Sequence, residues 1–198
     1  MSHHIKTIYQ QKDILIKLLD YQNTTIEDID LSILSLSDQQ IFKGFNSVKR
    51  QLEFYHLRFL WKTFYTNQKI LYKPTGKPYL KSGFLSMTHS HQRVVIAFSN
   101  KQNIGIDIEK ISEKLDRVKH KFLHKNDTFQ DLTDLTRLWT VKEAVYKLFD
   151  GDNLFFMDDV EVKTNSAIIN LNQLNLKAQT HSFFIDNDFM FSLAFNDL

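Results

Sequence analysis

Two segments of the chain carry apolar residues at the spacing of an amphipathic helix. In these segments apolar side chains recur every three or four residues, which places them on one helical face. We therefore predict a helix from Phe45 to Tyr65 and another from Arg137 to Phe149. Their apolar positions are Val48, Leu52, Tyr55 and Phe59 in the first helix and Leu138, Val141, Val145 and Leu148 in the second.

Between and after these helices the pattern changes to that of strands. Val94–Ser99 is β-branched and apolar, and Ile104–Ile108 alternates isoleucines with Gly105 and Asp107. The stretch 72–81 contains both prolines of the chain together with Gly76, which predicts a fixed loop. Further predicted strands are 160–164, 167–171, 183–185 and 189–195, the last two joined by the turn residues Asp186, Asn187 and Asp188.

The order of these elements predicts an α+β fold of two similar lobes, each a helix packed on an antiparallel sheet. Thr88-His89-Ser90, with Ala97-Phe98 nearby, returns as Thr180-His181-Ser182 with Ala194-Phe195 nearby. This echo indicates a pseudo-two-fold duplication. We assign residues 1–100 to the N-terminal lobe and residues 101–198 to the C-terminal lobe.

Composition narrows the class of protein. The chain has 198 residues, of which 42% are hydrophobic, enough for one compact domain or two joined lobes. Its apolar stretches are far shorter than a membrane span, and Lys6, Lys12 and Asp13 interrupt the segment where a signal peptide needs an apolar core. The chain has no cysteine, so nothing indicates an oxidising compartment. We expect a cytoplasmic protein that does not enter a membrane.

Charge alone does not identify a partner. The formal net charge is +2, from 25 basic and 23 acidic side chains. The most basic stretch runs from Lys43 to Lys62 and contains one acid, Glu53. Such a stretch is typical of a solvated helix face, and it is also compatible with binding nucleic-acid phosphates.

Gly105-Ile106-Asp107-Ile108-Glu109 places two carboxylates on one face of a predicted strand. Two such anions repel each other unless a cation lies between them, and a hard ion such as Mg²⁺ meets that need. The alternative is an exposed edge strand with alternating polar residues. Gly105, on the same face, leaves room for another backbone or a phosphate to approach.

The second predicted helix carries Glu143 and Lys147 four residues apart, so the two side chains share one face. An isolated Glu–Lys pair of this spacing is common on the exposed face of a helix. Trp139, one turn earlier, puts a large ring on the same side, which indicates that this face is covered or lines a cleft. Thr88, His89 and Ser90 offer two hydroxyls and an imidazole just before a strand, a group suited to donating hydrogen bonds to phosphate oxygens.

Four motifs in this order resemble those of Sfp-type 4′-phosphopantetheinyl transferases. They are Gly76-Lys77-Pro78, Thr88-His89-Ser90, Gly105-Ile106-Asp107-Ile108-Glu109 and Trp139-Thr140-Val141-Lys142-Glu143-Ala144-Val145-Tyr146-Lys147. The resemblance covers most of the chain from Val48 to Lys147. It implies a monomeric enzyme that moves the phosphopantetheine arm of coenzyme A onto a serine of an acyl or peptidyl carrier protein, with the metal and catalytic residues in the C-terminal lobe.

The resemblance also implies roles for individual residues. Asp107, Glu109 and Glu143 would bind Mg²⁺, or Mn²⁺, together with the coenzyme A pyrophosphate. Glu143 would also take the proton from the carrier serine, and Lys147 would neutralise or protonate the departing 3′,5′-ADP. The remaining assignments are His89, flanked by Thr88 and Ser90, at the pyrophosphate; Gly76, Lys77 and Pro78 against the adenine; and one or more of Lys49, Arg50 and Arg58 near the 3′-phosphate.

Two other functions use the same residues differently. A metal-dependent phosphodiesterase or nucleotide hydrolase would direct the same carboxylates at water. A nucleic-acid-binding module would use the basic helix and the aromatic side chains, and it gives no role to Asp107 and Glu109, which would repel phosphates without a metal. The resemblance favours the transferase.

Overall fold

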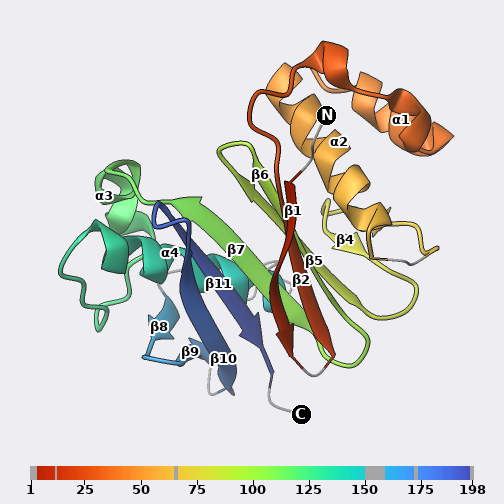
Figure 1. Ribbon diagram of the computed structural model, residues 1–198. Helices are drawn as coiled ribbons and strands as arrows, with labels where there is room; N and C mark the ends of the chain where they lie inside the picture. Colours follow the sequence, from red (N-terminus) through yellow and green to blue (C-terminus); the bar gives the residue numbers. More distant parts are fainter. Residues whose placement is uncertain (1–3, 12, 65–66, 150–158, 172–173, 197–198) are drawn as a thin grey trace.

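The computed structural model describes residues 4–11, 13–64, 67–149, 159–171 and 174–196. Two antiparallel sheets lie against each other, and each has helices on its opposite face (Figure 1). This arrangement confirms the predicted α+β fold with two lobes. No helix among these residues is long and apolar enough to cross a bilayer.

The N-terminal sheet has the strand order β1-β2-β6-β5. Helix α2 packs on it through Leu57, Leu60 and Trp61, which contact Leu19 and Ile96 of the sheet. The elements of this lobe are β1 (His4–Gln11), β2 (Ile14–Asp20), α1 (Leu36–Lys43), α2 (Val48–Lys62), β3 (Leu71–Tyr72), β4 (Pro78–Tyr79), β5 (Phe84–Ser90) and β6 (Arg93–Ser99), with short 3₁₀ turns at Ile26–Asp28 and Leu31–Ile33.

The C-terminal sheet has the strand order β7-β11-β10-β9-β8. Helix α4 packs on it through Val141, Ala144, Val145 and Leu148. Its elements are β7 (Ile104–Lys110), α3 (Lys114–Val118), a 3₁₀ turn at Lys119–Lys121, α4 (Leu132–Leu148), β8 (Val160–Val162), β9 (Ser166–Leu171), β10 (Leu174–Ile185) and β11 (Phe189–Phe195).

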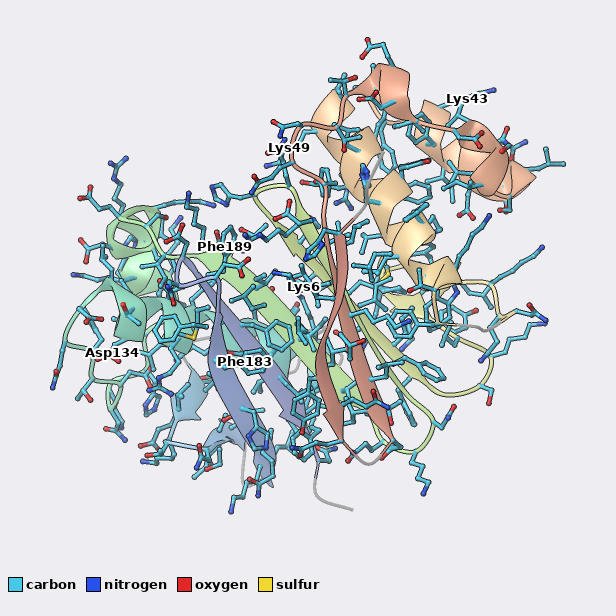
Figure 2. The ribbon with its side chains drawn as sticks, viewed as in Figure 1. Lys6, Lys43, Lys49, Asp134, Phe183 and Phe189 are labelled. Atoms are coloured by element: carbon cyan, nitrogen blue, oxygen red, sulfur yellow. The ribbon has the colours of Figure 1, made fainter. Side chains whose placement is uncertain are left out.

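The two sheets share one hydrophobic core. Ile16 and Leu18 of β2 lie in the same buried cluster as Ile106 of β7 and Phe191 of β11. Phe183 and Phe189, labelled in Figure 2, add aromatic rings to this cluster from the C-terminal sheet. Burial of this apolar surface holds the lobes together, because neither sheet can cover that face alone.

A row of hydroxyls joins the neighbouring edges of the two sheets. Ser86, Thr88 and Ser90 alternate along β5 and are all buried. Ser86 Oγ accepts from the backbone N–H of Ile106 at 3.0 Å, and Thr88 and Ser90 donate to carboxylates of β7. Side chains on a strand alternate between its faces, so His89 lies on the other side of β5, toward α2.

Gly105 lets helix α4 approach β7 at backbone distance. A Cβ atom at this position would lie 1.9 Å from the carbonyl oxygen of Ala144 and 2.7 Å from the backbone nitrogen of Leu148. No side chain fits there. Of the two possibilities that the sequence left open for Gly105, it is therefore another backbone that approaches.

The structure corrects several boundaries. Helix α4 begins at Leu132, five residues earlier than predicted, because the Asp131 carboxylate caps it by accepting from the backbone N–H of Asp134 at 2.9 Å. Thr88-His89-Ser90 precedes a strand, β6, as predicted, but it also forms the end of another strand, β5. The predicted loop 72–81 holds the short β3–β4 pair, with Gly76 at φ +87° in the turn between them.

The Thr-His-Ser echo does not mark equivalent positions. In the N-terminal sheet Ala97 pairs with Ser86, whereas in the C-terminal sheet Ala194 pairs with Thr180. The first Thr-His-Ser therefore lies closer to its hairpin turn than the second. The likeness of the two lobes rests on their sheets and helices, not on this repeat.

Candidate active site

A pocket of about 380 Å³ lies where β5 and β7 meet beneath α2 and α4. Both lobes contribute to its wall, so the pocket exists only when they are joined. It brings together most of the residues that the sequence singled out. The lining residues that carry the argument are Arg50 of α2, Gly76 and Pro78 of the β3–β4 hairpin, Thr88 and His89 of β5, Asp107 and Glu109 of β7, and Trp139, Glu143 and Lys147 of α4.

Asp107 is the buried centre of this group. Its Oδ1 atom accepts a hydrogen bond from Thr88 Oγ1 at 2.8 Å and lies 2.8 Å from the Nζ of Lys147. The same ammonium group also donates to the carbonyl oxygen of Ile106 at 3.0 Å. Strand β7, strand β5 and helix α4 are thus tied together at one carboxylate.

Glu109 and Glu143 complete the acidic side of the pocket. Ser90 Oγ donates to Oε1 of Glu109 at 3.1 Å. Burial first, and then the negative charges of Asp107 and Glu109, raise the pKa of Glu143, and Lys147 partly offsets them, so that the net pKa is about 7. A carboxyl group with this pKa exchanges a proton readily near neutral pH.

The three carboxylates suit a hard divalent cation, although they stand too far apart in this structure to enclose one. Three carboxylates that face one pocket have the charge and the oxygen donors that Mg²⁺ prefers, and the charges of Asp107 and Glu109 raise the pKa of Glu143. Among the described residues, no three His, Asp or Glu side chains converge closely enough to enclose an ion. At Asp107 the Lys147 ammonium supplies the positive charge. The assignment of Asp107, Glu109 and Glu143 as metal ligands stays a prediction.

His89 is held between two side chains of helix α2. Its Nδ1 atom lies 3.3 Å from Oε1 of Glu53, and its Nε2 atom lies 3.1 Å from Nη1 of Arg50. Burial lowers the pKa of His89, and the Glu53 carboxylate acts in the opposite direction. Sequence reasoning did not assign a role to Glu53. The available signal was that Glu53 is the single acid in the basic stretch from Lys43 to Lys62.

Of the three basic residues predicted near the 3′-phosphate, Arg50 lines the pocket. Lys49 has a side chain that is 80% exposed, and Figure 2 shows it pointing outward from the start of α2. Arg58 is buried behind the pocket wall, where its Nε donates to Asp38 at 2.8 Å and its Nη2 to the Tyr72 hydroxyl at 2.9 Å. The basic stretch is therefore not one continuous positive surface.

Two other predicted residues stand next to the pocket rather than in its lining. Lys77 directs its Nζ to the carbonyl oxygen of Lys147 at 2.9 Å, which ties the β3–β4 hairpin to the end of α4. Ser90 acts through Glu109, as described above. Gly76 and Pro78, on either side of Lys77, line the pocket itself.

Comparison with known proteins agrees with this site. Residues 103–194 match the model of the 4′-phosphopantetheinyl transferase superfamily. The match contains β7 with Asp107 and Glu109 and α4 with Glu143 and Lys147. The resemblance found in the sequence is thereby confirmed.

A curated relative supports the same family. The chain is 30% identical over 114 residues to 4′-phosphopantetheinyl transferase Gsp of Aneurinibacillus migulanus. The alignment covers 50% of this chain and 48% of the relative. The chain thus spans about half the length of the curated relative that it matches.

Proposed function

We propose that the protein transfers 4′-phosphopantetheine from coenzyme A to a serine hydroxyl of an acyl or peptidyl carrier protein and releases 3′,5′-ADP. One observation carries this proposal. A single pocket combines a protonatable carboxyl group, Glu143, with a lysine, Lys147, and with hydrogen-bonding groups from the opposite lobe, Thr88 and His89. All of these residues come from one chain, in keeping with a monomeric enzyme.

Glu143 is suited to act as the general base. The serine oxygen attacks the phosphorus that carries the pantetheine arm, a new P–O bond forms, and the serine proton passes to the Glu143 carboxylate. A base with a pKa near 7 is half in its active form at neutral pH and still accepts the proton well. The buried setting next to Asp107 gives Glu143 this property.

Lys147 is suited to the leaving group. When the bond between the two phosphoryl groups breaks, negative charge develops on the phosphate of 3′,5′-ADP, and an ammonium group at the pocket wall offsets it. Thr88, His89 and Arg50 can hold phosphate oxygens on the N-terminal side of the pocket. Positioning of the two substrates accounts for on the order of 7–11 kcal/mol in favourable reactions of this kind.

Asp107, Glu109 and Glu143 would hold the metal ion that the family implies, Mg²⁺ or Mn²⁺. When bound, such an ion neutralises pyrophosphate oxygens and lowers the barrier to their displacement. The hydroxyls of Thr88 and Ser90 orient two of these carboxylates through the bonds described above.

The proposal is tested by mixing the protein with coenzyme A, Mg²⁺ and a panel of apo carrier proteins from fatty-acid, polyketide and peptide synthesis. Intact-mass spectrometry should show one phosphopantetheine added to at least one carrier. Asp107→Asn should lower the rate by about a hundredfold or more, because the carboxylate that would hold the metal ion and that fixes the Lys147 ammonium is lost. Glu113→Gln, an exposed residue outside the pocket, should have the wild-type rate.

The same experiment separates the other functions. Release of 4′-phosphopantetheine from coenzyme A without a carrier would identify a hydrolase that uses water as the nucleophile. If no carrier is loaded and coenzyme A stays intact, the transferase proposal is wrong. Retention of near-normal turnover by Asp107→Asn would remove Asp107 from the reaction.

A further inference from the structure

Glu53 is a buried carboxylate of helix α2 that the reaction described above does not use. Its side chain is 5% exposed, and it lies behind the pocket, in contact with residues that line it. Arg50 Nη1 donates to its Oε2 at 3.2 Å, the Nδ1 of His89 lies 3.3 Å from its Oε1, and the Nζ of Lys49 lies 3.9 Å away. An acid beside a pocket for an anionic substrate calls for a physical reason, because it repels that substrate.

The contacts of Arg50 fix the position of the proton on His89. An arginine side chain can only donate hydrogen bonds, so the Nε2 atom of His89 must accept the bond from Arg50 at 3.1 Å. A neutral imidazole that accepts at Nε2 carries its proton on Nδ1. That proton then faces the Glu53 carboxylate.

Glu53 also holds Arg50, the cation that contacts His89. Arg50 is 52% exposed, with its guanidinium carbon 5.7 Å from the centre of the Phe45 ring, and the anion that it pairs with, Glu53, is buried beside Tyr21. The carboxylate therefore restrains both side chains that reach the N-terminal wall of the pocket. An arrangement formed before the ligand arrives reduces the ordering that binding would otherwise require.

We propose that Glu53 is a positioning residue, which holds His89 and Arg50 in place as a preassembled pair for the phosphate groups of the substrate. This inference rests on the proposed function. When a phosphate oxygen draws Arg50 away from Nε2, His89 can take a proton from solvent at that atom. It then donates through Nε2 to the phosphate and through Nδ1 to Glu53, whose negative charge stabilises the imidazolium.

The first test uses the protein without substrate and does not depend on its activity. Long-range ¹⁵N NMR spectra should show His89 with its proton on Nδ1 in the wild-type protein. Glu53→Met should convert the ring to a mixture of both tautomers, because the acceptor for Nδ1–H is gone and Arg50, no longer held by Glu53, stops donating steadily to Nε2. In the conservative variant Glu53→Gln the pKa of His89 should fall, since the carboxylate that raises it is lost while Arg50, Lys49 and Lys147 still lower it. Glu113→Gln should change neither property.

The second test is kinetic and follows only if carrier loading is observed. Glu53→Gln should raise the KM for coenzyme A about tenfold and leave kcat within about twofold, because the charge that stabilises the His89 imidazolium is lost in the ground state and the transition state alike. Glu53→Asp, which keeps the charge on a shorter arm, should recover part of the affinity.

The outcomes separate the two proposals. If no carrier is loaded but the tautomer shifts in Glu53→Met, the proposed function fails while the pairing of Glu53 with His89 stands. An unchanged tautomer in Glu53→Met, together with an unchanged His89 pKa in Glu53→Gln, overturns the positioning role. A loss of kcat in Glu53→Gln without a change in KM also overturns it.

Discussion

At the residue scale, four charged side chains of β7 and α4 stand around one pocket, and Glu53 of α2 lies behind it. Asp107, Glu109, Glu143 and Lys147 could be singled out because spacing along a strand or a helix fixes which side chains share a face. Glu53 could not, since its role depends on the distance between helix α2 and strand β5. A single sequence does not contain that distance.

Lys142 and Asp127 form the most buried ion pair of the described residues, and neither was recognised. Lys142 lies next to Glu143 in the chain but points to the other side of α4. Its Nζ is 2.6 Å from Oδ2 of Asp127, both side chains are fully buried, and Nζ also donates to the carbonyl oxygen of Val160. Asp127 accepts from the backbone N–H of His124 and of Val162. The pair ties α4 to strand β8 and to the segment before the helix.

Removing one member of this pair should destabilise the protein strongly. Lys142→Met leaves the Asp127 carboxylate buried without a counter-charge, so the free energy of unfolding should fall by about 3–5 kcal/mol. Urea unfolding followed by circular dichroism measures this change. The double variant Lys142→Met with Asp127→Asn should recover a large part of the loss, because no buried charge then remains.

A matched control tests whether burial is the cause. Lys119 pairs with Asp116 at 2.8 Å, but both side chains are at least 40% exposed. Lys119→Met should leave the free energy of unfolding nearly unchanged, as is usual for exposed pairs. Equal losses in Lys119→Met and Lys142→Met would contradict this account of the buried pair.

At the element scale, helices α2 and α4 and strands β6, β7 and β11 were predictable, because their apolar patterns are regular, whereas helices α1 and α3 were not predicted. The strands β1 and β2 were not recognised. In β2 the residues Ile14 to Leu19 are apolar except Lys17, and a short run of this kind does not reveal by its periodicity whether it is a strand or part of a buried helix. Strand β5 was missed because its alternating residues Ser86, Thr88 and Ser90 are polar, and Thr88 and Ser90 were interpreted only as groups that bind phosphate.

Close packing of α4 on β7 should make Gly105 irreplaceable. In Gly105→Ala the added methyl group meets the backbone of α4, so the helix must move outward and take Glu143 and Lys147 with it. We expect a loss of about 1–3 kcal/mol or more in the free energy of unfolding, as is typical of overpacked sites. Urea denaturation measures this loss, and carrier loading should decrease in parallel.

Gly44→Ala provides the comparison for Gly105→Ala. Gly44 ends α1 at φ −75°, a conformation open to any residue, and a Cβ atom there would lie 3.3 Å from the nearest backbone oxygen. This variant should lose much less stability and keep its activity. If Gly105→Ala proved as stable as Gly44→Ala, the close approach of α4 to β7 would be wrong.

At the scale of the whole molecule, the two lobes are joined on several sides. They share the core around Ile106 and Phe191, and the hydroxyl row of β5 links their sheet edges. On another side Arg93 of β6, only 6% exposed, reaches Asp186 in the β10–β11 turn at 3.0 Å and lies over the Phe189 ring. Two lobes could be predicted from the sequence, but these contacts arise only when the sheets pack.

Because of this shared core, we expect the lobes to unfold in one cooperative step. The chain has two tryptophans, and they lie in different lobes, Trp61 on α2 and Trp139 on α4. In Trp139→Phe the fluorescence reports on the N-terminal lobe, and in Trp61→Phe it reports on the C-terminal lobe. Within each variant, the urea midpoint from fluorescence should equal the midpoint from far-ultraviolet circular dichroism, which follows both lobes.

Comparison within each variant matters, because the substitutions themselves change stability. Trp61 donates from its Nε1 to the carbonyl oxygen of Gln68 at 2.9 Å, so Trp61→Phe should unfold at lower urea than Trp139→Phe. If fluorescence and circular dichroism gave separate midpoints in either variant, one lobe would unfold while the other persisted. The core between the sheets would then be too weak to couple them, and a pocket built from both lobes would open before the protein lost its helices.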